Sequence, residues 1–284
     1  MSPVALVTGA AGAIGGRTVV ALARAGWQVV ALDRPDDDDR LPYAVAVPGR
    51  LEAVVAEAVA AAPPGRPGRP AAPPAVDGAV DGEAAVVAWP GDAAHLDAVA
   101  GAVAEAERRY GGLDAVVVAA GVIAGGVPSW ELPVEQEAAV LEVDLAAVLV
   151  AARAGVPALL RRPVPRRGRF VAVASAAAVR GLPMLGAYCA AKAGVVGFVR
   201  ALAVELGGTG VTANAVSPGS TDTPLLAESA RLYGIEGAAV FAGQQPLGRL
   251  VEPGEVAAAI GFLLSDDAAA VTGANLAVDG GLSL

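Results

Sequence analysis

Short runs of aliphatic residues alternate along most of the chain with longer Ala-rich stretches. The runs that we predict to be strands are Val4–Val7, Trp27–Leu32, Ala85–Trp89, Ala115–Val118, Phe170–Ala174, Val211–Val216 and Leu276–Val278. The stretches that we predict to be helices are Ile14–Ala25, Leu96–Arg109, Val134–Leu160, Ala187–Leu206 and Pro253–Leu264. Wholly apolar strands separated by helices indicate a parallel sheet covered on both faces. The pattern therefore predicts a single α/β domain over 1–284 with a doubly wound (Rossmann) sheet, in which ligands bind at the carboxyl ends of the strands.

One connection, after the second predicted strand, is much longer than the roughly two to six residues usual in such folds. It spans 34–84 and contains an acidic run, Asp36–Asp39, an apolar piece, Leu41–Val47, and a helical piece, Leu51–Ala61. We expect the apolar piece to pack on the rest of the domain. The last part, 63–82, is rich in Pro, Gly and Ala, and we interpret it as a tolerated loop without regular structure.

Composition limits the class of protein. Hydrophobic residues make up 55% of the 284 residues and charged residues 17%, which allows a sizeable core and excludes overall disorder. The formal net charge of −9, without a basic run, argues against nucleic acid or an anionic membrane as a partner. A single cysteine, Cys189, excludes an intramolecular disulfide and a site of several thiolates. The single histidine, His95, is predicted at the surface, and no metal site is expected.

The most apolar stretch, Ala138–Leu160, is interrupted by Glu142, Asp144 and Arg153. No uncharged run approaches the roughly 20 residues that a membrane span requires. The chain also enters its first predicted strand without the basic segment that opens a secretory signal. We therefore expect a cytoplasmic protein.

A Gly-rich turn, Thr8–Gly15, follows the first predicted strand and leads into a helix. Glycines permit a tight turn and a close approach of the backbone to a pyrophosphate. The helix N-terminus adds N–H groups and a partial positive charge. A turn of this kind between a strand and a helix predicts a dinucleotide site.

Asp33 ends the second predicted strand, 24 residues after Gly9. A carboxylate there can accept hydrogen bonds from ribose hydroxyls and would repel a 2′-phosphate, which favours NAD over NADP. Arg34 follows directly and weakens this argument. The alternative role for Asp33 is a strand-end cap.

Tyr188 and Lys192 are four residues apart, so a helix places them on one face, and Ser175 follows the strand Phe170–Ala174. A free tyrosine, with a pKa near ~10, is a poor base at neutral pH. We expect the Lys192 ammonium and an oxidised nicotinamide to lower the pKa of Tyr188, which could then take the hydroxyl proton of an alcohol while hydride leaves for nicotinamide. Ser175 would hold the substrate oxygen. Each residue alone has an ordinary structural explanation, but their combination beside a dinucleotide turn predicts catalysis.

These motifs resemble those of the short-chain dehydrogenase/reductase family. The family's glycine signature lies over Thr8–Gly15, its Ser and Tyr-x-x-x-Lys over Ser175, Tyr188 and Lys192, and its Asn-x-x-x-Pro-Gly run over Asn214–Gly219; Thr272-Gly273 and Asp279–Gly281 match its ending. The resemblance implies NAD as the cofactor, bound by Gly9, Ala11, Gly12, Ala13, Ile14, Gly15, Asp33, Arg34, Asp92, Ala93, Ala119, Ala120, Gly121, Tyr188, Lys192, Pro218, Gly219, Thr221 and Thr223.

The chain departs from the family's pattern at three places. Ala13 replaces the middle glycine of the turn, and 118–121 reads Val-Ala-Ala-Gly in place of Asn-Asn-Ala-Gly. Asp144 replaces the helix asparagine that supports the family's proton relay. Asn donates and accepts hydrogen bonds, whereas ionised Asp only accepts them. We therefore count Asp144 among the catalytic candidates and expect its relay to differ.

A closer resemblance is to the mycofactocin-coupled members of the family, which include carveol dehydrogenases. The matching segments are 41–43, 50–52, 121–126, 187–192, 217–221 and 245–249. The resemblance implies that the insertion covers NAD so that it does not exchange, and that mycofactocin reoxidises the reduced cofactor in place. The wider family implies a homotetramer assembled through the helices corresponding to Leu145–Leu160 and Gly194–Leu206.

The segment Thr223–Pro246 lies where a lid would close over nicotinamide and substrate. Its apolar residues, together with Trp130, predict a small hydrophobic alcohol or ketone as substrate, although ordinary core packing explains any one of them equally well; they are Leu225, Leu226, Leu232, Tyr233, Ile235 and Phe241. One alternative is an ordinary dehydrogenase or 3-oxoacyl reductase with exchangeable NAD, against which the insertion argues. The other is a non-catalytic NAD-binding regulatory module, which Asp144 favours weakly and the intact Ser, Tyr and Lys oppose.

Overall fold

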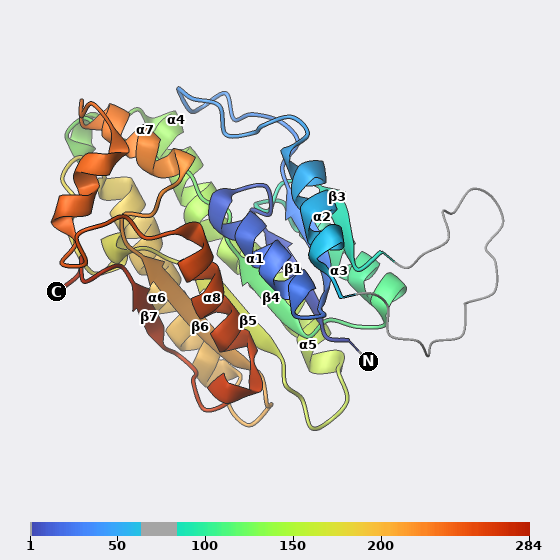
Figure 1. The fold of residues 1–284 in the computed structure, drawn as a ribbon. Coiled ribbons are helices and arrows are strands. Elements are labelled where there is room, and N and C mark those ends of the chain that lie inside the picture. Colours follow the sequence, from blue (N-terminus) through green and yellow to red (C-terminus); the bar gives the residue numbers. More distant parts are fainter. Residues whose placement is uncertain (1, 64–83) are drawn as a thin grey trace.

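The computed structural model describes residues 2–63 and 84–284, and in these ranges seven parallel strands form one sheet in the order β3-β2-β1-β4-β5-β6-β7 (Figure 1). The strands are β1 (Val4–Thr8), β2 (Gln28–Asp33), β3 (Val86–Pro90), β4 (Ala115–Val118), β5 (Arg169–Val173), β6 (Thr212–Pro218) and β7 (Asn275–Val278). The chain reverses its direction of travel across the sheet between β1 and β4, which is where doubly wound folds bind ligands. The predicted fold class is confirmed.

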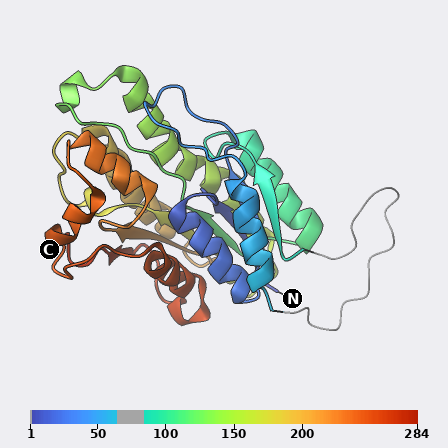
Figure 2. The same cartoon turned by 45° about the horizontal axis from the view of Figure 1, so that its top comes forward.

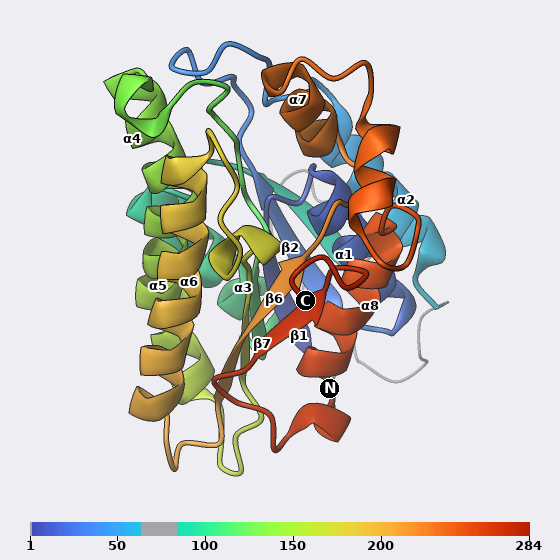
Figure 3. The same cartoon turned by 90° about the vertical axis from the view of Figure 1, so that its left-hand side faces the viewer.

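Helices cover both faces of the sheet, as Figure 3 shows. On one face lie α1 (Ala13–Arg24), α2 (Arg50–Ala61) and α8 (Pro253–Leu264), and on the other lie α3 (Leu96–Tyr110), α5 (Ala147–Arg161) and α6 (Gly186–Glu205). Successive residues of β1 enter different cores, because side chains alternate along a strand: Leu6 packs in the core under α3, α5 and α6, and Val7 in that under α1, α2 and α8. This is why the strands are apolar throughout.

The stretch predicted as one helix over Val134–Leu160 is divided, and this prediction was wrong in detail. It consists of α4 (Val134–Leu141), a π-helical turn η2 (Glu142–Ala146) and α5. A π turn widens the helix locally and is often found at functional sites. Here it contains Asp144, whose side chain is fully buried.

Several short elements lie at the carboxyl ends of the strands. The lid predicted over Thr223–Pro246 contains α7 (Pro224–Leu232) and a 3-10 helix η4 (Ala238–Gln244); further 3-10 turns are η1 (Ser129–Glu131), η3 (Ala176–Ala178) and η5 (Asp266–Ala268). Residues 35–49, here called the strap, leave β2 and cross this end of the molecule near α4 before α2 begins (Figures 1 and 2).

The strap packs on the domain, as its apolar residues predicted. Leu41 is buried in an apolar cluster with Val122, Val143 and Tyr188. The predicted Pro/Gly-rich loop over 63–82 lies outside the described residues except for Pro63.

Two helical stretches, Val134–Arg161 and Gly186–Glu205, are long and apolar enough to cross a membrane by length and composition alone. Both pack against the sheet, and α5 and α6 contribute many of the residues of the core on that face. The helices are therefore explained as the core helices of this fold.

Candidate active site

A cavity of about 1530 Å³ extends along the carboxyl ends of the strands. Of the residues predicted to bind cofactor or substrate, it is lined by Gly9, Ala11, Gly12, Ala13, Ile14, Asp33, Arg34, Ala119, Ala120, Gly121, Ser175, Tyr188, Lys192, Pro218, Gly219, Thr221 and Thr223. A pocket for one drug-sized ligand has a volume of roughly 300–1,000 Å³. The cavity therefore has room for two molecules side by side.

The Gly-rich turn forms one end of the cavity. Gly9 has φ +66°, and a Cβ there would overlap the backbone of Ala120, so only glycine fits. Gly15 does not line the cavity, because it packs against the backbone of Gly9 inside the turn. Helix α1 begins at Ala13, and Gly12 at the N-cap has no side chain to bind the first N–H groups of the helix. The N-terminus of α1 thus remains available to an anion.

Asp33 supports this turn directly. Its Oδ2 accepts a hydrogen bond from the N–H of Ala11 at 2.6 Å, and its Oδ1 accepts one from the N–H of Arg34 at 2.8 Å. Burial raises the pKa of Asp33 and outweighs the opposing effect of these hydrogen bonds. The alternative role of Asp33 as a strand-end cap is therefore realised, and the residue borders the cavity as well.

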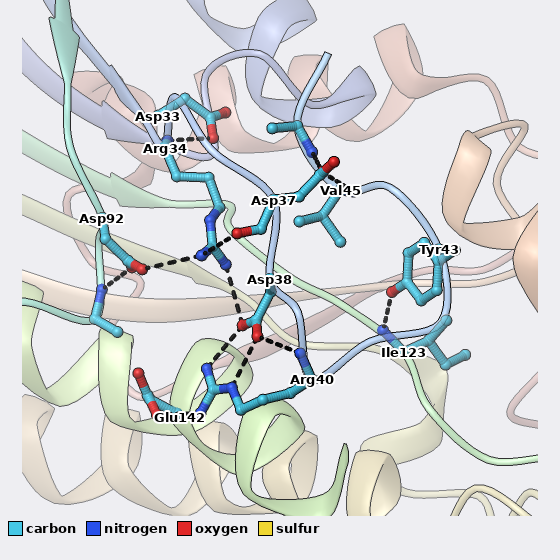
Figure 4. Close-up of polar contacts among 12 residues, drawn as sticks. Asp33, Arg34, Asp37, Asp38, Arg40, Tyr43, Val45, Asp92, Ile123 and Glu142 are labelled. Atoms are coloured by element: carbon cyan, nitrogen blue, oxygen red, sulfur yellow. Dashed lines mark hydrogen bonds and ion pairs between the residues drawn. The ribbon is translucent and has the colours of Figure 1, made fainter. Parts of the chain in front are cut away.

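Arg34 is surrounded by acceptors, as Figure 4 shows. Its guanidinium lies 3.2 Å from Oδ2 of Asp38, 3.2 Å from the carbonyl oxygen of Asp37 and 3.7 Å from Oδ2 of Asp92. The positive charge is therefore already compensated within the protein. Asp92 and Ala93 line a separate small cavity of about 20 Å³, beside Asp33 and Arg34, and not the large one.

The three predicted catalytic residues meet at the other end of the cavity, on β5 and α6. Ser175 follows β5, and its Oγ accepts a hydrogen bond from the N–H of Ala177 at 3.1 Å. Tyr188 and Lys192 lie one turn apart on α6, and the Lys192 Nζ is 5.6 Å from the centre of the Tyr188 ring. The Lys192 ammonium also donates to the carbonyl oxygen of Val173 at 3.3 Å, which ties it to the end of β5.

Asp144 forms a buried ion pair with Lys192. Oδ1 of Asp144 lies 3.0 Å from Nζ of Lys192 and accepts a hydrogen bond from the N–H of Val122 at 3.2 Å. Its Oδ2 has no hydrogen-bond partner among the residues that the structure describes. Burial raises the pKa of Asp144 against the effect of Lys192. Burial is the largest single influence on the pKa of Lys192 and acts to lower it, but the charges of Asp144 and Tyr188 and the hydrogen bond to Asp144 together outweigh burial, and the pKa is raised.

The pKa of Tyr188 differs from the expectation drawn from Lys192. Burial raises this pKa and outweighs Lys192, which acts to lower it. The charge of Asp144 raises it as well, whereas Ser175, which lies beside the phenol, acts to lower it by hydrogen bonding. Lys192 therefore acts on this pKa in the expected direction, but the deep burial of the Tyr188 side chain decides the net shift, which is upward.

The lid supplies much of the apolar wall near Ser175 and Tyr188. The lid residues that line the cavity include Leu225, Leu226, Tyr233, Ile235 and Phe241, as predicted. Leu232 packs in the core cluster beneath them instead. Trp130 is 85% exposed and does not line the cavity, so its assignment to the pocket was wrong.

Two charged lid residues were not predicted. Glu228 is buried, lines the cavity and accepts a hydrogen bond from Nε of Arg231 at 2.8 Å. Glu228 and Arg231 are three residues apart on α7, a spacing at which helical side chains meet. That spacing is the signal by which the pair could have been found. The pair brings a compensated charge, not a free one, to the cavity.

The strap also lines the cavity, through Pro35 and residues 43–49. The phenol oxygen of Tyr43 accepts a hydrogen bond from the N–H of Ile123 at 2.8 Å (Figure 4). Burial raises the pKa of Tyr43, so it remains a neutral phenol. Neither Tyr43 nor Arg40 was a predicted site residue, because no local pattern reveals a contact 80 residues away along the chain.

His95 precedes α3 and is exposed, as predicted. Over 2–63 and 84–284, no group of three or more His, Cys, Asp or Glu side chains is placed to hold a metal ion.

A doubly wound sheet with a Gly-rich turn after β1, and with Ser, Tyr and Lys converging from β5 and α6, defines an oxidoreductase of the short-chain type. The chain belongs to the short-chain dehydrogenase/reductase family. Residues 71–283 match the model of a branch of this family that is described as Enoyl-(Acyl carrier protein) reductase.

Relatives and solved structures agree with this assignment. Cyclohexanol dehydrogenase of Acinetobacter sp. (strain SE19) is 34% identical over 280 residues, which cover 98% of this chain and 93% of the relative. Cis-4-hydroxycyclohexanecarboxylate dehydrogenase of Sinomonas cyclohexanicum is 40% identical over 190 residues, or 67% of this chain and 74% of the relative. The crystal structure of carveol dehydrogenase from Mycobacterium avium in complex with NAD superimposes with a TM-score of 0.85 at 27% identity, covering 99% and 97% of the two chains.

Proposed function

We propose that this protein is an NAD-dependent dehydrogenase that interconverts a hydrophobic secondary alcohol and the corresponding ketone. We propose that the natural substrate is a cyclic alcohol. The observation that carries the proposal is that Ser175, Tyr188 and Lys192 line the same cavity as the Gly-rich turn. The relatives that act, by name, on cyclohexanol and on a hydroxycyclohexane carboxylate favour a cyclic substrate.

The residues at the turn fit NAD. The first N–H groups of α1 and the close backbone at Gly9 suit the pyrophosphate. Asp33 keeps lone pairs for ribose hydroxyls beyond the two backbone hydrogen bonds that it accepts. The acceptors around Arg34 leave it no free charge for a 2′-phosphate. Together these contacts favour NAD over NADP.

The residues around the reacting alcohol have distinct tasks. When bound, oxidised nicotinamide supplies the hydride acceptor and a positive charge that favours the Tyr188 phenolate. Ser175 holds the substrate oxygen by a hydrogen bond, and Tyr188 takes the hydroxyl proton as the C–H hydrogen leaves with its electron pair. The ketone is formed in the same step. Lys192 stabilises the phenolate, and Asp144 keeps Lys192 charged and in place.

The lining of the cavity near Tyr188 favours a neutral, apolar substrate. Leu225, Ile235 and Phe241 of the lid line the cavity together with Ile123 and Leu185. Burying an apolar ring against such side chains contributes roughly 25 cal/mol for each Å² removed from water. A substrate carboxylate would find no free cation on the lid, because Arg231 is paired with Glu228.

We further propose that residues 34–84 are an insertion whose strap retains NAD between turnovers, and that mycofactocin reoxidises the cofactor in place. The eight strap residues that line the cavity support retention. The similarity to a carveol dehydrogenase supports the same proposal.

The test begins with protein purified without added cofactor. The protein is denatured, released NAD is quantified, and oxidation of cyclohexanol and carveol is followed with free NAD and separately with an artificial electron acceptor. Near-stoichiometric NAD, with turnover only through the acceptor, supports a retained cofactor and a dedicated redox partner. An empty protein that turns over steadily with free NAD shows an ordinary dehydrogenase with exchangeable NAD. An enzyme that oxidises neither alcohol under either condition contradicts the proposed activity.

We also propose a cytoplasmic homotetramer that uses the outer faces of α5 and α6. Leu149 and Val204 are exposed apolar residues on these helices, with 43% and 82% of their surface accessible. Light scattering on the eluting protein measures the mass directly, and replacement of both residues by Lys is expected to dissociate the assembly.

A further inference from the structure

We propose that the strap is a working part of the catalytic site, in which Tyr43 and Arg40 are positioning residues for the Asp144–Lys192 pair. The inference deepens the proposed function, on which its kinetic test rests. It adds to cofactor retention a second role for the strap, in the chemical step itself. The contacts that carry it are made by the middle of the strap, between Asp38 and Tyr43 (Figure 4).

The first contact is made by Tyr43. Its phenol oxygen accepts the N–H of Ile123 at 2.8 Å, and the preceding amide, that of Val122, donates to Oδ1 of Asp144 at 3.2 Å. Oδ1 of Asp144 also lies 3.0 Å from the ammonium of Lys192. The strap and Asp144 therefore bind two consecutive amides of one backbone segment after β4. Without the phenol oxygen, a buried amide loses its partner, and its neighbour is less well held.

The second contact is made by Arg40. Its guanidinium lies 2.7 Å from Oε2 of Glu142, the first residue of the π turn that carries Asp144. Asp38 fixes the guanidinium from the strap side, with its Oδ1 accepting from Nε at 2.8 Å and its Oδ2 from NH2 at 2.7 Å. Paired, charge-assisted hydrogen bonds of this kind are strong and directional. Asp38 is itself buried, so the strap holds Arg40 in a defined orientation.

Apolar packing joins the two polar contacts. Leu41, between Arg40 and Tyr43 along the strap, is buried in the cluster that contains Val122, Val143 and Tyr188. Val143 is the residue directly before Asp144. The strap thus contacts the elements on both sides of Asp144: the backbone after β4 and the π turn.

The hydrogen bonds of Tyr43 and Arg40 do not involve Leu225, Ile235 or Phe241, the lid residues to which we assign substrate binding. The orientation of Lys192, and with it the charge beside the Tyr188 phenol, does depend on these hydrogen bonds. Loss of a positioning contact should therefore slow the chemical step and leave substrate affinity nearly unchanged.

The kinetic test measures the single-turnover rate of NAD reduction in enzyme preloaded with NAD, as a function of cyclohexanol concentration. For Tyr43→Phe, which keeps the ring but not the oxygen, we expect the limiting rate to fall about tenfold, with the half-saturating concentration within about twofold of the parent. The limiting rate of Arg40→Gln is expected to fall by a similar factor, again with little change in the half-saturating concentration.

Matched controls remove similar contacts elsewhere. Tyr110→Phe loses a partly buried hydrogen bond of 2.8 Å to the carbonyl oxygen of Ala84, and Arg161→Gln loses a 2.8 Å ion pair with Glu107. Both should keep the limiting rate of the parent. Limiting rates of Tyr43→Phe and Arg40→Gln equal to those of the controls would overturn the proposal.

A second test does not require activity. Amide hydrogen exchange in the NAD-free protein should become about tenfold faster over residues 142–147 in Tyr43→Phe, and should not change there in Tyr110→Phe. If the parent enzyme oxidises no alcohol, the proposed function is contradicted, and the hydrogen-exchange result alone tests whether Tyr43 positions the Asp144–Lys192 pair. Faster exchange over 142–147 then supports the positioning role, and an increase confined to the strap and Ile123 overturns it.

Discussion

The carboxylate of Asp144 lies 3.0 Å from the ammonium of Lys192, with both side chains buried. The family places a neutral amide at this position, whereas here a carboxylate lies beside Lys192, the residue that we propose stabilises the Tyr188 phenolate. A buried ion pair requires free energy to remove both charges from water, and removal of one partner destabilises the fold further because it leaves the other charge buried and uncompensated. Its effect on Tyr188 gives the first prediction.

Asp144→Asn should move the pH profile of alcohol oxidation to lower pH. Asp144 raises the pKa of Tyr188, and the rate of oxidation rises with pH as the phenolate forms. Removal of the charge therefore brings the rise to lower pH, while an amide oxygen can still accept from Val122. The measurement is kcat against pH, with the exposed Asp266→Asn as a control that should not shift. A shift to higher pH would show instead that Lys192 needs Asp144 to keep its proton.

Asp144→Ala should destabilise the fold, because it leaves the Lys192 ammonium buried without its charged partner. The expected loss in the free energy of unfolding is ~3–5 kcal/mol, measured by denaturant titration. An exposed ion pair such as Arg17–Glu57 is worth far less, and Glu57→Ala should cost under ~1 kcal/mol. Equal losses in the two variants would mean that Asp144 and Lys192 are not an ionised pair in the folded protein.

Tyr188→Phe should abolish turnover and leave cofactor binding intact. The ring remains packed in its cluster, but no group is left to take the alcohol proton, so kcat should fall by about 100-fold or more. NAD binding, followed by quenching of tryptophan fluorescence, should stay within about threefold of the parent. Full turnover in this variant would contradict the assignment of Tyr188 as the proton acceptor and favour a role of the protein in NAD binding alone.

Asp33→Asn should relax the preference for NAD. The amide oxygen can still accept from Ala11, while the charge that would repel a 2′-phosphate is removed. The ratio of kcat/KM for NAD to that for NADP should fall about tenfold or more. Adding Asp38→Asn frees a charge on Arg34 and should lower the ratio further. An unchanged ratio would mean that Asp33 acts only as a cap of the turn.

Gly9→Ala should cost more stability than an equivalent change at Gly208. Both glycines have positive φ, +66° and +74°, so an alanine is strained at either position by ~1–2 kcal/mol. Only at Gly9 does the added Cβ overlap backbone, that of Ala120, whereas nothing lies within 4 Å at Gly208. The free energy of unfolding should therefore fall by about 1–3 kcal/mol more for Gly9→Ala. Similar losses in both variants would contradict the close approach of β1 and β4.

Local pattern determined the sheet, most of the helices, and the Gly-rich turn and the Ser175, Tyr188 and Lys192 side chains that line the cavity. Apolar runs such as Ala115–Val118 predict buried parallel strands, because a strand covered on both faces cannot expose polar residues on either. The spacing of Tyr188 and Lys192 predicts a shared face, because the helical period is a local property. These inferences depend on neighbours in the chain, and a single sequence contains them.

Tertiary structure decided what those residues touch. The contacts of Tyr43 with Ile123 and of Arg40 with Glu142 join residues 80 and 102 positions apart, and no periodicity encodes such a distance. The π turn at Asp144, the deep burial that raises the pKa of Tyr188, and the exposure of Trp130 also follow from packing between elements. The identity of the catalytic side chains is thus a matter of sequence, whereas their charge state and support are set by the residues that folding brings around them.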